Sequence, residues 1–267
     1  MRLRIHHVTH YRFDRGVQRG LQQIRKRPKS SHGQSVLNWR TDVTGGKREL
    51  SFDDHHNNRV ELLSFERDTQ EIVITSEGEV EVTEQSGVVG PHLGPAPLWL
   101  YKRSTPQNRA GAGVRAIVRR VEGDDDLTRL HDLSRLIAGD ITYEIASSDP
   151  DWTAEDAVAA GKGVCQDHTH VFVAAARELG LPARYVSGYL MLNDRTNQEA
   201  MHAWAEAHVE GLGWVGFDVS NGISSDERYV RVATGLDYAD AAPVKGIRMG
   251  GAGEGLSVRI EVAEQPQ

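Results

Sequence analysis

Polar and apolar positions alternate with a period of two in the first part of the chain. Residues 3–13 follow this alternation, with one face of the segment drier than the other, and residues 37–43 repeat it. Shorter runs of β-branched or apolar residues follow at 60–65, 71–75 and 79–83. A period of two is that of a half-buried strand, and several short strands at close spacing are typical of a sandwich or barrel. The pattern therefore predicts an all-β, sandwich-like N-terminal domain over residues 1–90.

The pattern changes between residues 91 and 113, where prolines and glycines stand among short polar stretches. Pro and Gly interrupt both helices and strands, so residues 91–113 are the predicted linker. Beyond it, apolar residues recur every three or four positions in 127–137 and again in 171–179. This is the spacing of an amphipathic helix, and Asp125 is among the acidic residues that can cap the first of the two.

A third, short helix is predicted to end near Gly161, because Thr153 and Asp156 have the spacing of a capping box. Strand-like runs then return at 185–192, 200–209, 214–219, 229–233 and 256–262. The glycine-rich residues 246–255 are expected to form a flexible connection. Together these elements predict an α+β core over residues 114–267, with helices packed on an antiparallel sheet.

Composition narrows the class of protein. The chain has 267 residues, of which 39% are hydrophobic and 26% charged, so a disordered protein is excluded. The longest apolar run, Val171 to Ala176, is far shorter than the roughly 20 residues of a membrane span. Residues 1–30 show no apolar leader. Because Cys165 is the single cysteine, an intrachain disulfide is excluded, and we expect a cytoplasmic protein that does not bind membranes.

Charge is distributed unevenly along the chain. The formal net charge is -7, yet residues 1–48 carry twelve Lys and Arg against only Asp14 and Asp42. The basic run from Arg25 to Lys29 could bind nucleic acid, or it could be a solvated turn that pairs with acidic residues of the same chain. We favour the turn, because no recognisable nucleic-acid motif accompanies the run.

Cys165 is the strongest candidate for chemistry. It follows the glycine-rich stretch Gly161–Val164 and directly precedes a predicted helix. Backbone N–H groups and the positive end of the helix dipole at this position favour a thiolate over a thiol. A lone cysteine is more often an inert buried thiol, but its place at a helix start favours a nucleophile whose base lies farther along the chain.

His202 and Asp218 are the candidate partners of Cys165. His202 lies on a predicted strand, Gly211 to Gly213 signals a turn, and Trp214 to Val219 is predicted to return antiparallel. A tight turn would not place Asp218 directly opposite His202, so we expect an asymmetric loop or a bulge in this hairpin. Asp218 could then hold one imidazole nitrogen while the other faces the thiol.

These residues stand in segments that resemble the bacterial transglutaminase-like superfamily of cysteine-protease-like proteins. The resemblance rests on Gly163–Asp167, Gly180–Tyr189, His202–Glu206 and Gly213–Asp218, which occur in the order of the family's Cys, His and Asp motifs. The β-rich segment upstream resembles the N-terminal region that often precedes this core. The resemblance implies a papain-like core, thiol acyl transfer without a cofactor, and Cys165 as nucleophile, His202 as base and Asp218 as orienting group.

Two departures from the family pattern concern residues outside the predicted triad. Val219 stands where many members have Pro, and His168 and His170 lie where one position is commonly aromatic. A metal site at His168 and His170 is not expected, because helix positions two apart face different directions.

The candidates for lining the substrate cleft are Gln166, Tyr185, Tyr189 and Trp204.

The leading hypothesis is therefore a transglutaminase-like cysteine protease or amidase that acts on peptide or isopeptide amides. Hydrolysis is favoured over transamidation, because the sequence shows no feature that admits an amine while excluding water. The alternative is a catalytically silent module that binds a protein partner. An intact set of Cys165, His202 and Asp218 argues against this alternative.

Overall fold

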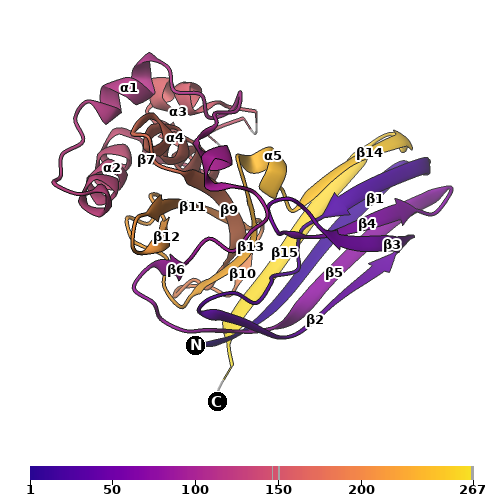
Figure 1. The fold of residues 1–267 in the computed structure, drawn as a ribbon. Coiled ribbons are helices and arrows are strands. Elements are labelled where there is room, and N and C mark those ends of the chain that lie inside the picture. Colours follow the sequence, from indigo (N-terminus) through magenta and orange to yellow (C-terminus); the bar gives the residue numbers. More distant parts are fainter. Residues whose placement is uncertain (146, 150, 266–267) are drawn as a thin grey trace.

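The computed structural model describes residues 1–145, 147–149 and 151–265. In these residues the chain forms a large eight-stranded sheet, a five-stranded sheet and a layer of helices (Figure 1). The strands of the large sheet are β1 (Arg2–Ile24), β2 (Gln34–Thr44), β3 (Gly46–Asp53), β4 (Arg59–Phe65), β5 (Thr69–Val82), β10 (Asn197–Gln198), β14 (Val244–Gly250) and β15 (Glu254–Glu264). The first strands agree with the predicted alternation, except that β5 joins two predicted runs and β3 is an addition.

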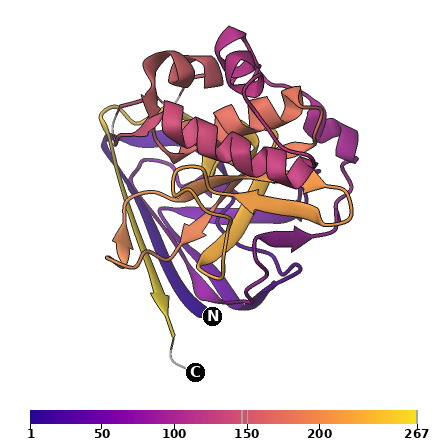
Figure 2. The ribbon, with the colours of Figure 1, turned by 90° about the vertical axis from the view of Figure 1, so that its left-hand side faces the viewer.

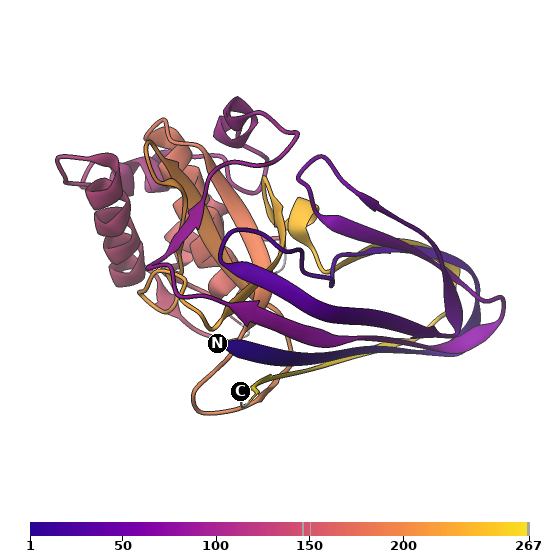
Figure 3. The ribbon, with the colours of Figure 1, turned by 60° about the horizontal axis from the view of Figure 1, so that its bottom comes forward.

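The first strand organises the large sheet, because it is long and bent. Residues 3–13 of β1 pair antiparallel with β15 and residues 17–24 with β14, so one continuous ladder turns a corner. At this corner the Asp14 N–H donates to the carbonyl of Ala252 at 2.9 Å. Gly253 has a φ of 66°, a backbone conformation that glycine adopts without steric cost. Figure 3 shows the sheet curving round at the end farthest from the helices.

The C-terminal strands depart from the expected division of the chain. Residues 114–267 were expected to form one core, yet β14 and β15 lie in the sheet built by residues 2–82. Residues 246–255 were expected to be a flexible connection, but they form most of β14, a tight turn and the start of β15. Glycine content indicated flexibility there, whereas pairing with β1 satisfies the backbone groups of this segment.

The five-stranded sheet is antiparallel throughout and has the order β13-β9-β11-β12-β6. Its strands are β6 (Val88–Gly90), β9 (Ala183–Leu190), β11 (His202–Val209), β12 (Gly213–Phe217) and β13 (Tyr229–Gly235). The predicted β11–β12 hairpin is present, with Val209 paired to Gly213. Its ladder is regular, so the predicted bulge or asymmetric loop is wrong. The small parallel pair β7 (Thr142–Tyr143) and β8 (Lys162–Gly163) precedes the central helix.

Helices cover the face of the five-stranded sheet that points away from the large sheet (Figures 1 and 2). They are α1 (Ala112–Val118), α2 (Asp126–Asp140), α3 (Ala154–Ala160) and α4 (Cys165–Glu178), and a short α5 (Tyr238–Ala241) follows β13. The predicted caps are confirmed, because Asp125 accepts the Thr128 N–H and Thr153 forms a capping box with Asp156. Residues 167–177 of α4 are all buried, so this helix is the centre of the core rather than an amphipathic surface helix.

The predicted linker packs on the core. It contains the 3₁₀ helix η1 (Leu98–Lys102), whose Tyr101 is buried edge-on against Trp214 with ring centroids 5.2 Å apart. On the same face of this sheet, Arg184 stacks 3.9 Å from the centre of the Trp214 ring and forms a buried ion pair with Glu206 at 2.5 Å.

The basic run at Arg25–Lys29 is not a solvated turn. Arg25 and Lys26 are buried, although Arg25 pairs with Asp54 at 3.4 Å and Lys29 with Asp53 at 2.8 Å. The pairing with acidic residues of the same chain is as expected. Burial arises because the end of β1 turns inward between the large sheet and the core, where Tyr189 donates a hydrogen bond to the carbonyl of Lys26.

Candidate active site

Cys165 is the first residue of the central helix α4. The chain reaches it through β8 and Val164, whose N–H donates to the Asp167 carboxylate at 2.7 Å. Asp167 is buried and accepts this hydrogen bond, and it therefore fixes the first turn of α4. The N–H groups of a first turn have no partner within the helix, so the helix start offers hydrogen-bond donors beside the thiol.

His202 and Asp218 meet at the start of β11 and just beyond the end of β12. His202 Nε2 lies 2.5 Å from Asp218 Oδ2. Because Ala205 pairs with Phe217, a ladder extended by one pair would place Asp218 opposite Trp204. His202 is the diagonal neighbour on the same face, which is within reach of a long side chain. The diagonal contact explains how the two residues meet without a bulge.

The pKa values of this pair move apart. Burial lowers the pKa of His202, but hydrogen bonds to Asp218 and Cys165, and the charges of both, outweigh burial and raise this pKa to about 10. Burial raises the pKa of Asp218, but the hydrogen bond from His202 and the positive charge of the His202 ring outweigh burial and lower this pKa to about 2. At neutral pH the site therefore holds a carboxylate and an imidazolium. Because Nε2 faces Asp218, Nδ1 is the ring nitrogen left for Cys165.

The Asp218 carboxylate is held by residues that the sequence reasoning missed. Ser220 donates to Oδ1 at 2.7 Å, and the Asn221 side chain and the Tyr229 hydroxyl donate to Oδ2 at 2.7 and 2.8 Å. Asp218 is fully buried, so these donors replace its water. The turn-forming sequence from Ser220 to Gly222 directly after Asp218 is a signal for the first two donors, whereas no local pattern points to Tyr229 on β13.

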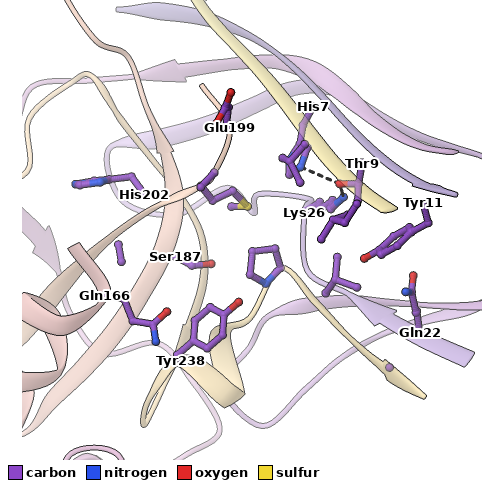
Figure 4. A pocket seen from close by; sticks show the side chains of 18 of the residues that line it. His7, Thr9, Tyr11, Gln22, Lys26, Gln166, Ser187, Glu199, His202 and Tyr238 are labelled. Carbon is purple, nitrogen blue, oxygen red and sulfur yellow. Dashed lines mark hydrogen bonds between the residues drawn. The ribbon is translucent and has the colours of Figure 1, made fainter. Parts of the chain in front are cut away.

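Cys165 and His202 line a cavity of about 520 Å³ between the core and the inner face of the large sheet (Figure 4). Val164, Gln166, Tyr185, Ser187 and Tyr238 belong to its core wall. The opposite wall comes from β1, the segment just after it, β14 and β15, and includes residues such as His7, Thr9, Phe13, Lys26, Leu256 and Val258. The volume lies within the roughly 300–1,000 Å³ of small-molecule and peptide-side-chain sites.

Two of the four expected cleft residues lie in this wall and two do not. Gln166 and Tyr185 line the cavity, as expected. Tyr189 is buried against the large sheet, where its hydroxyl contacts His7 Nδ1 at 3.0 Å. Trp204 packs edge-on against Tyr229, with ring centroids 5.3 Å apart, and is not among the residues that line the cavity. Alternation along β9 and β11 could not reveal which strand positions face the cavity.

His168 and His170 are both buried in α4 beneath the site. His168 contacts the carbonyls of Val164 and Ile141 at 2.9 and 3.0 Å, and so ties α4 to the end of α2. His170 Nε2 accepts the Tyr238 N–H at 3.2 Å. Burial, with a smaller effect of Arg177, lowers the pKa of His170 to about 3, so this ring is neutral.

Comparisons with known proteins identify the family of this chain. Residues 115–219 match the model of the transglutaminase-like superfamily, and residues 3–81 match the bacterial transglutaminase-like N-terminal region. The chain is therefore a member of the transglutaminase-like superfamily, with the core preceded by that N-terminal region.

Relatives and solved structures extend the similarity beyond the two matched segments. An uncharacterized protein of Mycobacterium leprae is 25% identical over 280 residues, which cover 98% of each chain. An uncharacterized protein of Mycobacterium tuberculosis is 36% identical over 128 residues, or 44% of this chain and 41% of the relative. A crystal structure from Cytophaga hutchinsonii, described as a "Putative Cysteine Protease", superposes with a TM-score of 0.81 at 20% identity. It covers 100% of this chain and 91% of its own, and so shares the fold.

Two features of the described residues bear on the class of site. Within them no group of three or more His, Cys, Asp or Glu side chains is placed to hold a metal ion. None of their helices is both long and apolar enough to cross a bilayer.

Proposed function

We propose that this protein is a thiol-dependent acyl transferase that acts on peptide or isopeptide amides, and that hydrolysis is its main reaction. One observation carries the proposal. The only cysteine and the ring of His202 line one cavity, the thiol is among the groups that raise the pKa of His202, and the buried carboxylate of Asp218 is hydrogen-bonded to that ring. A nucleophile, a base and an orienting group in contact are the elements of covalent acyl transfer.

The first half of the reaction forms a thioester. Cys165 Sγ attacks the carbonyl carbon of the amide, and the carbonyl oxygen becomes an oxyanion. The Cys165 N–H at the start of α4 is placed to donate to this oxyanion, which is worth about 3–4 kcal/mol for donors of this kind. His202 then gives its Nδ1 proton to the leaving nitrogen, the C–N bond breaks and an amine departs.

The second half of the reaction releases the acyl group. Neutral His202 takes a proton from water, the resulting hydroxide attacks the thioester carbonyl, and the C–S bond breaks. The products are a carboxylic acid and the thiolate, and His202 is again an imidazolium. Throughout the cycle Asp218 stays ionised, orients the ring through Nε2 and stabilises its charged form. The lowered pKa of Asp218, which burial opposes and the contact with His202 produces, supports this division of roles.

Water is the acceptor that needs no binding site of its own, so we favour hydrolysis over transamidation. A cytoplasmic location is part of the same proposal, since a reducing compartment keeps a single cysteine available as a thiolate. Partition between the two reactions can be measured by adding an amine such as glycine ethyl ester during turnover. Hydrolysis predicts that the free acid remains the major product.

The test of the proposal compares the wild-type protein with Cys165→Ala on a panel of peptide amides and activated esters. We expect turnover by the wild type and its loss in the variant, with an acyl adduct on Cys165 visible by mass spectrometry of quenched wild-type samples. Equal turnover by both proteins would refute the assignment of Cys165. Absence of turnover and of any adduct would leave the fold as a binding module.

A further inference from the structure

Lys26 is a buried lysine that faces the same cavity as Cys165 from the opposite wall (Figure 4). Its side chain comes from the segment just after β1 and reaches back to Thr9, because the bend in β1 brings these residues together. Lys26 is only 1% exposed. Lysines are almost never buried to this extent unless they are paired with an acid.

The ammonium group of Lys26 has no acidic partner in the described part of the chain. Its one side-chain hydrogen bond is to the hydroxyl of Thr9. Burial alone lowers the pKa of Lys26, to about 7, and no carboxylate opposes this effect. An ammonium group has three N–H donors, so two have no acceptor among the residues that the structure describes.

A chain of hydrogen bonds fixes the position of this amine. Thr9 donates to His7 Nε2 at 3.1 Å, His7 Nδ1 donates to the Tyr189 hydroxyl at 3.0 Å, and that hydroxyl donates to the carbonyl of Lys26 at 3.2 Å. Burial, followed by the nearby charge of Lys26, holds the pKa of His7 well below its ordinary value, so His7 is neutral. The amine is therefore the sole positive charge of this network, and its position is set before any ligand arrives.

The other charged groups of the cavity wall do not compete for this position. Arg248 forms an ion pair with Glu254 on the hairpin of β14 and β15. Glu199 is exposed to water, and His202 is engaged by Asp218. The cavity wall that contains Lys26 also includes the apolar side chains of Phe13, Leu256 and Val258.

We propose that Lys26 binds a free carboxylate of the substrate, carried on an apolar stem whose other end presents the amide carbonyl to Cys165. The substrates would then be peptide or acyl amides with a free carboxylate, such as a C-terminal or side-chain one. The carboxylate would fill the two unused donors of the amine and restore the charge that burial disfavours. This inference rests on the proposed function of Cys165, but it concerns a different residue and a different part of the cavity.

The experiment uses alkylating reagents in matched pairs. N-bromoacetyl derivatives of ω-amino acids with one to five methylene groups end in a carboxylate, and their carboxamides are neutral controls of the same length. For each pair we would measure the rate of Cys165 modification and its saturation constant. At one or two lengths we expect the carboxylate reagent to modify Cys165 at least about tenfold more efficiently than its carboxamide, mainly because its saturation constant is lower. A hydrogen-bond donor held in a fixed position discriminates strongly against a ligand that lacks the matching acceptor.

Substitution of the lysine then assigns the preference. Lys26→Met should abolish it, so that the carboxylate and the carboxamide reagent of each pair modify Cys165 at equal rates. Lys102→Met, which removes an exposed lysine outside the cavity, should change neither quantity. Equal rates for the two members of every pair in the wild type, or a preference that survives Lys26→Met, would overturn the inference. If Lys26→Met does not fold, Lys26→Gln replaces it, with folding checked by circular dichroism.

A second measurement separates this inference from the proposed function. In Cys165→Ala, binding of the matching N-acetyl amino acids and their amides can be followed by calorimetry without any reaction. Tighter binding of the carboxylates, lost in Cys165→Ala with Lys26→Met, would support the role of Lys26 even if Cys165 proved unreactive. Equal binding of acids and amides would overturn it even if Cys165 were alkylated rapidly.

Discussion

His202 Nε2 lies 2.5 Å from Asp218 Oδ2, although the two residues are not opposite each other in the β11–β12 ladder. The diagonal contact depends on Asp218 standing one residue past the strand, where a turn begins. There the Asn221 N–H donates to Oδ1 at 3.2 Å, so one carboxylate closes the turn with one oxygen and orients the imidazole with the other. The turn and the site are consequently coupled, and changes at the carboxylate should affect both.

Asp218→Asn keeps the shape of this side chain but removes its charge. An amide can present its N–H to Nε2 and hold the ring in the wrong tautomer, so we expect kcat to fall by roughly 10³–10⁴. The alkaline limb of the pH profile, set in the wild type by a His202 pKa of about 10, should move to lower pH because Asp218 supplies much of the upward shift. Steady-state kinetics between pH 6 and pH 11 measure both effects. An unchanged alkaline limb would contradict the assigned contact.

Tyr229→Phe removes one donor to Asp218 without touching His202 or Cys165. The lost hydrogen bond to a charged group is worth about 1.5–3 kcal/mol, so the orientation of Asp218 should suffer and kcat should fall by about tenfold or more. Because Tyr229 acts through Asp218, the pH profile should shift as well. Tyr101→Phe is the matched control, since its hydroxyl contacts His56 rather than Asp218. A loss of stability without a change in the profile would show Tyr229 to be structural only.

The ion pair at His202 should make stability depend on pH. The pKa of His202 is about 10 in the folded protein against 6.5 in the unfolded one, so its contribution is complete below pH 6.5 and is lost toward pH 10. The pKa of Asp218 is about 2 against 3.8, so its contribution is complete above pH 3.8 and is lost toward pH 2. Urea unfolding of the wild type and His202→Gln should therefore differ most between these limits, near pH 4 to 6.5. A difference in the free energy of unfolding that grows toward pH 10 would contradict the expected direction of the pH dependence.

Glu155 joins α3 to the start of α1. Its carboxylate accepts the N–H groups of Gly111, Gly113 and Val114 at 2.8 to 2.9 Å, as a capping residue would. Glu155→Ala should lower the free energy of unfolding by about 1–2 kcal/mol, the cost of losing a strong helix cap. Glu178→Ala is the control, because Glu178 forms an exposed ion pair with Arg115 that is worth about 0–1 kcal/mol. Equal losses of unfolding free energy in the two variants, measured by chemical denaturation, would show that the Glu155 cap contributes no more than a surface ion pair.

The local pattern of apolar, polar and turn-forming residues was sufficient to predict the elements around the site, including the β11–β12 hairpin and the helix start at Cys165. It could not identify strand partners far apart in sequence. Ile5 pairs with Val262 across almost the whole chain, and the alternation of residues 3–13 says only that one face is buried. The burial of Lys26 was missed for the same reason. A lysine in a basic run is normally solvated, and only the bend of β1 brings it inside.

The most direct test of the account is the rate of iodoacetamide labelling of Cys165 as a function of pH, in the wild type and in His202→Gln. A thiolate held by the imidazolium of His202 predicts wild-type labelling that persists well below pH 7, and a shift of the labelling curve to higher pH in the variant. Intact mass spectrometry counts the modification on a protein with one cysteine. Identical curves for the two proteins, each rising only near the pH at which a free thiol ionises, would contradict the account.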